Sequence, residues 1–251
     1  MTVKNPDREA LAHGHITNET VRPKPSIPTW ALKLIMAVTG LLFVLFVIGH
    51  MAGNLKLYLP AHNGEAALDV YGAFLRGMGE PLFPHEALLW VIRIVLLGAL
   101  IAHVWGAGVL HARSSKSRGK FRRTNLMGGL DSFATRTMLA TGAILLLFII
   151  FHILDLTMGV APAAPDSFVH GAVKANMIAT FSRWPVTIFY VLAMLTLFLH
   201  MTHGIKLAMF DLGLTGFKTR QVIVFLAYVI PAIVVIGNII MPLSIALGWV
   251  S

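Results

Sequence analysis

Five long stretches of apolar residues, separated by shorter polar segments, dominate the pattern of hydrophobic and polar positions along this chain. They run over residues 30–55, 87–110, 135–160, 185–210 and 221–243. Each is as long as the ~20 apolar residues that a helix needs to cross the hydrocarbon core of a bilayer. They lack the alternation of apolar and polar residues that is typical of strands in a membrane barrel. The pattern therefore predicts an all-α integral membrane protein, a bundle of five transmembrane helices.

The polar segments predict how the rest of the chain is organised. Residues 1–28 are polar and proline-rich and lack the apolar core of a signal peptide, so we expect an N-terminal tail followed by one transmembrane domain over 29–251. Residues 65–76 predict a short helix at the membrane surface. No internal repeat is evident, and Pro231 is the one proline expected to break a span.

The composition indicates that lipid is the solvent for much of the surface. Hydrophobic residues make up 57% of the 251 residues and charged residues 12%, with a mean hydropathy of +0.77. Soluble domains carry roughly 25% charged residues, so this chain has too few charges for a soluble surface. Cysteine is absent, which excludes disulfides, thiolate metal sites on this chain and covalent c-type haem attachment.

The net charge of +9 comes from basic residues that gather in particular segments. Fifteen of the 20 lysine and arginine residues lie in or next to the tail, the segment between the second and third spans, and the segment between the fourth and fifth. The most basic run is 113–123, whereas the opposite segments hold four basic residues. Cytoplasmic segments of membrane proteins are rich in Lys and Arg. We therefore predict a cytoplasmic N-terminal tail and an outside C-terminus, with no nucleic acid as a partner.

Five histidines lie inside the predicted spans: His50, His103, His152, His200 and His203. Ionisable residues within a membrane are costly and mark functional sites by default. Successive helices alternate in direction and rise ~1.5 Å per residue, which places His50 and His152 in the outer half of the membrane. His103 and His200 lie in the inner half, each about 12 Å from the inner end of its helix. The histidines therefore form two layers, each with imidazoles from two helices.

Two imidazoles at one height are what a six-coordinate haem iron requires, because imidazole is a common axial ligand and bundle cores hold such sites. A single membrane histidine is more commonly a hydrogen-bond partner between helices, but four at paired heights favour ligation. His203 lies three residues after His200 and shares its face. One of the two is expected to ligate and the other to form a hydrogen bond, and the spacing does not decide which.

Glycines lie close in sequence to three of these histidines: Gly49, Gly53, Gly98, Gly106 and Gly204. Small residues let helices approach closely, and they also leave room for a flat macrocycle. They therefore agree with a haem between the helices.

Arg93 is a second costly residue, in the outer half of the second span. It can pair with a haem propionate or a quinone carbonyl. Its depth equally permits its side chain to extend to the outer interface as a plain anchor. The sequence supports both roles.

Several stretches resemble a known family in their order and spacing. They are His50-Met-Ala-Gly-Asn-Leu with Tyr71-Gly-Ala-Phe-Leu-Arg76, then Ser132-Phe-Ala-Thr-Arg-Thr-Met138 leading to Phe151-His152, and His200-Met-Thr-His-Gly204. The chain resembles the cytochrome b membrane anchor of succinate:quinone oxidoreductases (succinate dehydrogenase/fumarate reductase). It is similar to the type in which one five-helix polypeptide carries two haems. The resemblance covers nearly all of the chain after the tail.

The resemblance implies two haem b groups, one between His50 and His152 and the other between His103 and His200. The family has a histidine four residues before the glycine of its fourth helix, which selects His200 over His203 as the ligand. It also implies menaquinone as the substrate and a bacterial cell membrane as the location. Electrons would come from a cytoplasmic iron–sulfur subunit. Succinate would be oxidised on a flavoprotein subunit, so this chain would have no succinate-oxidising site.

The same resemblance bears on partners and on the quinone site. A further small membrane subunit and a higher oligomer of the complex are compatible with it. If electrons leave at the outer centre, Glu86 and Arg93 are the nearest groups able to bind a quinone carbonyl or carry a proton. The alternative is a solvated Glu86, with quinone bound inside, near the iron–sulfur partner.

Three other interpretations stay open. One is a di-haem cytochrome b of a hydrogenase or formate dehydrogenase. Another is a histidine-lined proton or metal transporter, although such proteins show inverted repeats and broken helices at the membrane midplane. The third is a Rieske-type iron–sulfur cluster at one site, which uses two histidines and two cysteines. Because this chain has no cysteine, a partner subunit would have to supply them.

Overall fold

The computed structural model describes residues 26–61, 63–118 and 129–250, and within them the side chains of 26–61, 63–116 and 137–250. Residues 1–25 of the predicted tail and residues 119–123 of the basic run lie outside these ranges, so the predicted roles of the tail and of the run stay predictions. Within the described ranges the chain is helical and has no strand. This confirms the predicted all-α fold class.

Five of the described helices are long and apolar enough to cross a membrane, as predicted. They are α2 (Thr29–Asn54), α4 (Ala87–Arg118), α5 (Gly129–Ile153), α7 (Trp184–Asp211) and α8 (Phe217–Ala246). Shorter elements connect them: the 3-10 helix η2 (Leu55–Tyr58), α3 (Ala67–Gly77), the π-helical turn η3 (Leu154–Met158) and α6 (Val173–Phe181). The short helix predicted over 65–76 is α3. Helix α6 lies in the segment between the third and fourth predicted spans, where the sequence predicts no helix.

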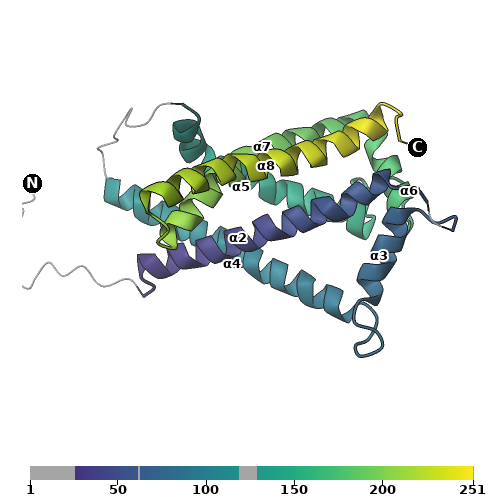
Figure 1. The fold of residues 1–251 in the computed structure, drawn as a ribbon, viewed down its shortest axis with the longest axis horizontal. Helices are drawn as coiled ribbons and strands as arrows, with labels where there is room; N and C mark the ends of the chain where they lie inside the picture. Colours follow the sequence, from purple (N-terminus) through teal and green to yellow (C-terminus); the bar gives the residue numbers. More distant parts are fainter. Residues whose placement is uncertain (1–25, 62, 119–128, 251) are drawn as a thin grey trace, which may run out of the picture.

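The five long helices form a bundle in which α7 is central. It packs against α2, α5 and α8, whereas α4 packs chiefly against α2. In Figure 1, α2, α7 and α8 run side by side, and α4 diverges from α2 until α3 bridges their far ends. We call this end, where α3 and α6 lie, the outer end, following the predicted orientation. The opposite end, where α2 begins, is the inner end.

Between its two ends the surface of the bundle is apolar. Large side chains such as Ile94 on α4, Leu147 on α5 and Ile233 on α8 are more than half exposed. Lipid tails can cover such a surface, because the backbone groups of a spanning helix are paired within the helix. The buried apolar residues form one cluster at the outer end around α7 and a second between α2, α7 and α8.

The prolines of α8 do not interrupt it. The sequence predicts a break at Pro231, but α8 continues through both Pro231 and Pro242. Both prolines are fully buried. In membrane helices, neighbouring helices and local adjustments re-satisfy the backbone groups that a proline frees. The predicted break is therefore wrong.

An odd number of spans places the two termini on opposite sides of the membrane. If the N-terminus is cytoplasmic, as the distribution of Lys and Arg predicts, an alkaline phosphatase fused after Ser251 should be exported and active. The matched control is the same fusion after Gly213, between α7 and α8, which should be inactive. If the phosphatase were active after Gly213 and inactive after Ser251, the orientation would be the opposite of the predicted one.

Candidate functional site

Two pairs of histidines lie at different heights between the helices. The inner pair joins His103 on α4 to His200 on α7, with ring centroids 6.3 Å apart. A threonine on a neighbouring helix holds each ring. Thr39 Oγ1 on α2 lies 2.9 Å from His103 Nδ1, and Thr141 Oγ1 on α5 lies 3.1 Å from His200 Nδ1. His203 lies further along α7, and the ring that faces His103 is that of His200.

The threonine hydroxyls determine which nitrogen of each inner ring carries the proton. Thr39 donates to the carbonyl oxygen of Ile35 at 2.6 Å, and Thr141 donates to that of Met138 at 3.0 Å. A hydroxyl has one hydrogen to donate, so toward the histidine it accepts. Nδ1 therefore carries the proton in both rings, which leaves the Nε2 lone pair available to a metal ion.

The outer pair joins His50 on α2 to His152 on α5. Their ring centroids are 5.8 Å apart and their planes are perpendicular. A phenylalanine one turn earlier stacks on each imidazole: Phe46 on His50, with centroids 5.4 Å apart, and Phe148 on His152, at 5.7 Å. These aromatic rings restrict the rotation of the imidazoles and keep their faces apolar.

Helices α2 and α5 present these residues with the same spacing. Both carry Thr-Gly-x5-Phe-x3-His, over 39–50 and 141–152. In both, the glycine faces the histidine of the next spanning helix: a Cβ at Gly40 would lie 3.5 Å from the His103 ring, and one at Gly142 would lie 3.4 Å from the His200 ring. The pairs α2–α4 and α5–α7 are thus two structural repeats. The two units share contacts and few identical residues, so the repeat belongs to the structure and is not evident in the sequence.

A buried carboxylate lies beside the outer pair. Asp155 is fully buried and accepts hydrogen bonds from the Thr180 hydroxyl at 3.0 Å and the Arg183 guanidinium at 2.9 Å. Its other oxygen accepts from the Tyr190 hydroxyl at 2.9 Å, and this hydroxyl lies 3.3 Å from His152 Nδ1. Because the Arg183 side chain is 30% exposed, a continuous series of polar contacts runs from the surface to the outer pair.

The π-helical turn η3 holds Asp155 within this series. It follows α5 directly and ends at Gly159, whose φ is +67°. The ring of Phe168 packs so closely on Gly159 that a Cβ there would collide with it. π-helical turns are uncommon and occur frequently at functional sites. Here the turn places a carboxylate one helical turn beyond His152.

The geometry of both pairs suits a metal ion held between two imidazoles. A metal–imidazole bond is about 2 Å long and the ring centroid lies roughly 1 Å behind the nitrogen, so two rings on opposite sides of one ion have centroids roughly 6 Å apart. The observed separations are 5.8 and 6.3 Å. Among the described residues no group of three or more metal-ligating side chains gathers. Each pair thus offers two protein ligands, which suffices for a haem iron, since the macrocycle supplies the others.

The glycines that lie close in sequence to the histidines differ in what packs against them. A Cβ at Gly49, Gly98 or Gly204 would meet no heavy atom within 4 Å. Side chains of neighbouring elements cover the other two glycines, Gly53 and Gly106. Three of the five glycines therefore have no side chain packed against them, and two of these, Gly49 and Gly98, lie on the exposed surface of their helices.

Arg93 and Glu86 lie together near the outer end. The Arg93 guanidinium lies 4.8 Å from the centre of the Trp90 ring and 3.7 Å from the Glu86 carboxylate. Arg93 precedes the paired histidine of its helix by ten residues, as Tyr190 does on α7. The repeat therefore places Arg93 at the height of the outer pair.

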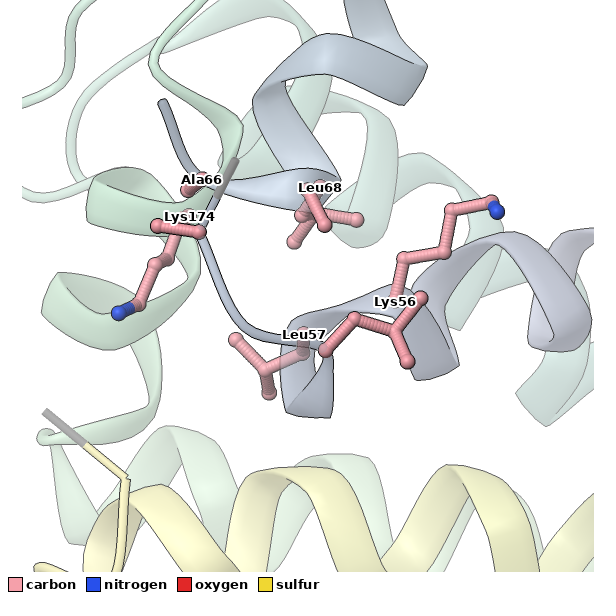
Figure 2. A pocket seen from close by; sticks show the side chains of 8 residues that line it. Lys56, Leu57, Ala66, Leu68 and Lys174 are labelled. Carbon is pink, nitrogen blue, oxygen red and sulfur yellow. The ribbon is translucent and has the colours of Figure 1, made fainter. Parts of the chain in front are cut away.

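A small pocket opens at the outer end between η2, α3 and α6 (Figure 2). Its lining includes Lys56, Leu57, Leu68 and Lys174. Its volume of about 30 Å³ has room for no more than a few water molecules. The two lysine side chains extend away from each other in Figure 2. The pocket is too small for a quinone head group, and its lysines do not converge on an anion.

The sequence analysis does not predict a role for four residues that lie around the two histidine pairs. Asp155 has a signal, since an acid within the predicted third span is costly. Thr39, Thr141 and Tyr190 have none, because hydroxyls in a helix commonly bond to their own backbone or to a neighbour without further function. Their proximity to the histidines follows from packing alone.

The sequence model of the succinate dehydrogenase/fumarate reductase transmembrane subunit family matches residues 114–240, just over half of the chain. The chain belongs to this family. The matched part contains α5, η3, α6, α7 and most of α8, and with them the ligand candidates His152 and His200. No curated protein and no solved structure matches the chain.

This membership makes the chain a multi-pass transmembrane subunit of a succinate dehydrogenase or fumarate reductase complex. It confirms the anchor family that the motifs resemble. From here on we call the chain the anchor subunit.

Because Arg183 pairs with the buried carboxylate of Asp155, we expect that removing the positive charge of Arg183 lowers the stability of the fold. Breaking a buried pair costs roughly 3–5 kcal/mol and an exposed pair much less, so Arg183→Met in this partly exposed pair should lower the free energy of unfolding by about 1–3 kcal/mol. Arg183→Lys keeps the charge and should lose less than half as much. Thermal unfolding of the purified complex, followed by circular dichroism, measures both variants. Equal losses would show that the charge of Arg183 does not matter.

Proposed function

We propose that the anchor subunit holds two haem b groups and passes electrons from a cytoplasmic iron–sulfur subunit to menaquinone, in a bacterial cell membrane. A flavoprotein subunit of the same complex would oxidise succinate, so this chain would carry no succinate-oxidising site. The observation that carries the proposal is the presence of two histidine pairs, each from two different helices, with centroids 6.3 and 5.8 Å apart. Family membership supports the kind of complex, and the pairs support the cofactors.

The chain's own residues would hold both cofactors. His103 and His200 would ligate at the inner centre, and His50 and His152 at the outer centre, each through Nε2. A haem bound there supplies a one-electron carrier. The threonines keep the inner imidazoles in the tautomer that exposes Nε2. The stacked phenylalanines fix the ring planes of the outer imidazoles.

Other cofactors and activities fit these residues less well. A Rieske cluster needs two thiolates, and the chain has no cysteine. Transporters commonly bind their ions at broken midplane helices, whereas α8 is continuous through its prolines. Membership of the succinate dehydrogenase/fumarate reductase family also favours this function over a cytochrome b of a hydrogenase or formate dehydrogenase.

We further propose that menaquinone binds near the outer end, beside Glu86 and Arg93. The Arg93 guanidinium can donate to a quinone carbonyl, and the Glu86 carboxylate, 3.7 Å from it, can carry a proton. The adjacent surface of α4 exposes the large apolar side chains of Trp90 and Ile94. This combination suits a quinone, whose polar head group is attached to a long apolar tail.

Substituting the histidines one at a time tests the pairing. His103→Ala and His200→Ala should each empty the inner centre and keep the outer one, and His50→Ala and His152→Ala should do the reverse. His203→Ala is the matched control and should keep both. Haem quantitation with a redox titration of the purified complex measures each centre. Loss of a centre in the His203 variant and its retention in the His200 variant would contradict the assignment.

Replacing Glu86 tests the quinone site. Glu86→Gln keeps the size of the side chain but removes its charge and its ability to carry a proton. Succinate-dependent menaquinone reduction by the purified complex should fall by about tenfold or more, with the haem content unchanged. Glu80→Gln is the control, because Glu80 is an acid of the same loop that pairs with His85 at 2.8 Å. An unchanged rate in the Glu86 variant, or equal losses in both, would exclude this site.

A further inference from the structure

The carboxylate of Asp155 is buried in a membrane-spanning segment, and neither haem ligation nor quinone binding uses it. It is fully buried, and its oxygens accept from the side chains of Thr180, Arg183 and Tyr190 at 2.9–3.0 Å. Three donors, one of them a guanidinium, suit an ionised carboxylate, which can only accept hydrogen bonds. A charge placed at this depth is costly, so its position calls for a function.

The directions of the hydrogen bonds connect Asp155 to the outer pair. Because Asp155 accepts, Tyr190 gives its single hydroxyl hydrogen to the carboxylate, 2.9 Å away. Toward His152, 3.3 Å away, the hydroxyl oxygen therefore accepts. The proton of His152 must be on Nδ1, and its Nε2 lone pair faces the other side of the ring. Through one tyrosine, the carboxylate thus selects the tautomer of a ligand candidate.

We propose that Asp155 is a positioning residue for the outer centre, and that it acts through the Tyr190 hydroxyl to orient the His152 imidazole and make it a stronger electron donor to the metal. The proposal rests on the proposed function, because the outer pair must hold haem. Histidines bound to metals commonly donate their second N–H to a carboxylate or another acceptor, which raises the basicity of the ligand. Hydrogen bonds in series polarise one another, so the tyrosine transmits part of this effect.

The arrangement acts on one ligand of one centre. In the first repeat, the position equivalent to Asp155 is Gly53, against which Tyr71 packs, and the position equivalent to Tyr190 is Arg93. Within the described part of the chain, the His50 ring stacks on Phe46 and forms no side-chain hydrogen bond. The two outer imidazoles are therefore inequivalent, whereas each inner imidazole has its own threonine.

The test compares the midpoint potentials of the two centres in the purified complex. Tyr190→Phe removes the hydroxyl and keeps the ring, and Asp155→Asn removes the charge and keeps the shape. Both variants should retain two haems. Because a weaker donor stabilises oxidised iron less, the ratio of reduced to oxidised outer haem at a fixed potential should rise about three- to tenfold, or about 30–60 mV. The inner centre should keep its potential.

Thr141→Val is the matched control, because it removes the acceptor for His200 Nδ1 at the inner centre. It should shift the inner potential and leave the outer one in place. A variant that merely loosened the bundle would shift both centres or lose haem, so the opposite selectivity of Thr141→Val and Tyr190→Phe separates positioning from general structure. The proposal would be overturned if Tyr190→Phe shifted the midpoint potential of the inner centre as much as that of the outer centre.

Combining the substitutions tests whether Asp155 acts through Tyr190. If it does, Asp155→Asn should add little to the shift already present in Tyr190→Phe, because the two residues belong to one hydrogen-bonded series. A full additional shift would indicate a direct field of the charge and would overturn the proposed route. Should Asp155→Asn yield no stable complex, because Arg183 loses its partner, the double variant Asp155→Asn with Arg183→Gln replaces it in this comparison.

The outcomes separate this inference from the proposed function. If the unsubstituted complex contains no haem ligated by His50 and His152, the proposed function fails before any variant of Asp155 is made. If it contains two haems and the outer potential is the same in Tyr190→Phe, Asp155→Asn and the unsubstituted complex, the role of Asp155 alone is overturned.

Discussion

Polar groups inside a bilayer must find their partners within the protein, because the hydrocarbon core offers no water. The bundle meets this requirement with hydroxyl groups for three of the four paired histidines. Thr39 and Thr141 lie against the inner rings and Tyr190 against His152. Each of these hydroxyls gives its own hydrogen elsewhere, to a main-chain carbonyl or to a carboxylate. The need to satisfy buried polar groups therefore also orients the imidazoles and presents one nitrogen of each held ring to the space between the helices.

The repeated unit explains why the pairs are stacked in two layers. α2 and α5 run in the same direction and carry a threonine and a histidine eleven residues apart. At ~1.5 Å per residue this spacing separates their two levels by about 16 Å. The threonine level meets the histidines of α4 and α7, and the histidine level forms the outer pair. Two copies of one helix pair thus create two different sites. At the inner site each histidine contacts a threonine, whereas at the outer site, in the ranges that the structure describes, only His152 contacts a hydroxyl group.

The difference between the halves extends to their packing. α7 lies at the centre of the bundle and carries Tyr190 and His200, so its residues are held from several sides. α4 packs chiefly against α2 and exposes large apolar side chains along its outer half, including Trp90 and Ile94. Segments with few packed neighbours open more easily than the core. This suits the proposed function, in which the well-packed residues of α7 keep His200 and Tyr190 in place and the outer half of α4 offers a lipid-facing surface to a quinone.

The sequence by itself determined the number of spans and the heights of the four paired histidines, because bilayer thickness and helix rise are constants that convert residue positions into depth. It did not determine how each helix is rotated about its axis or which helix is its neighbour. Those depend on side-chain packing across the bundle, which has no local signature. Tertiary structure alone decided that the two threonines face imidazoles, that Asp155 reaches Tyr190, and that α8 stays helical through Pro231. In each case the partner that satisfies the polar or backbone group comes from packing that no local stretch of sequence encodes.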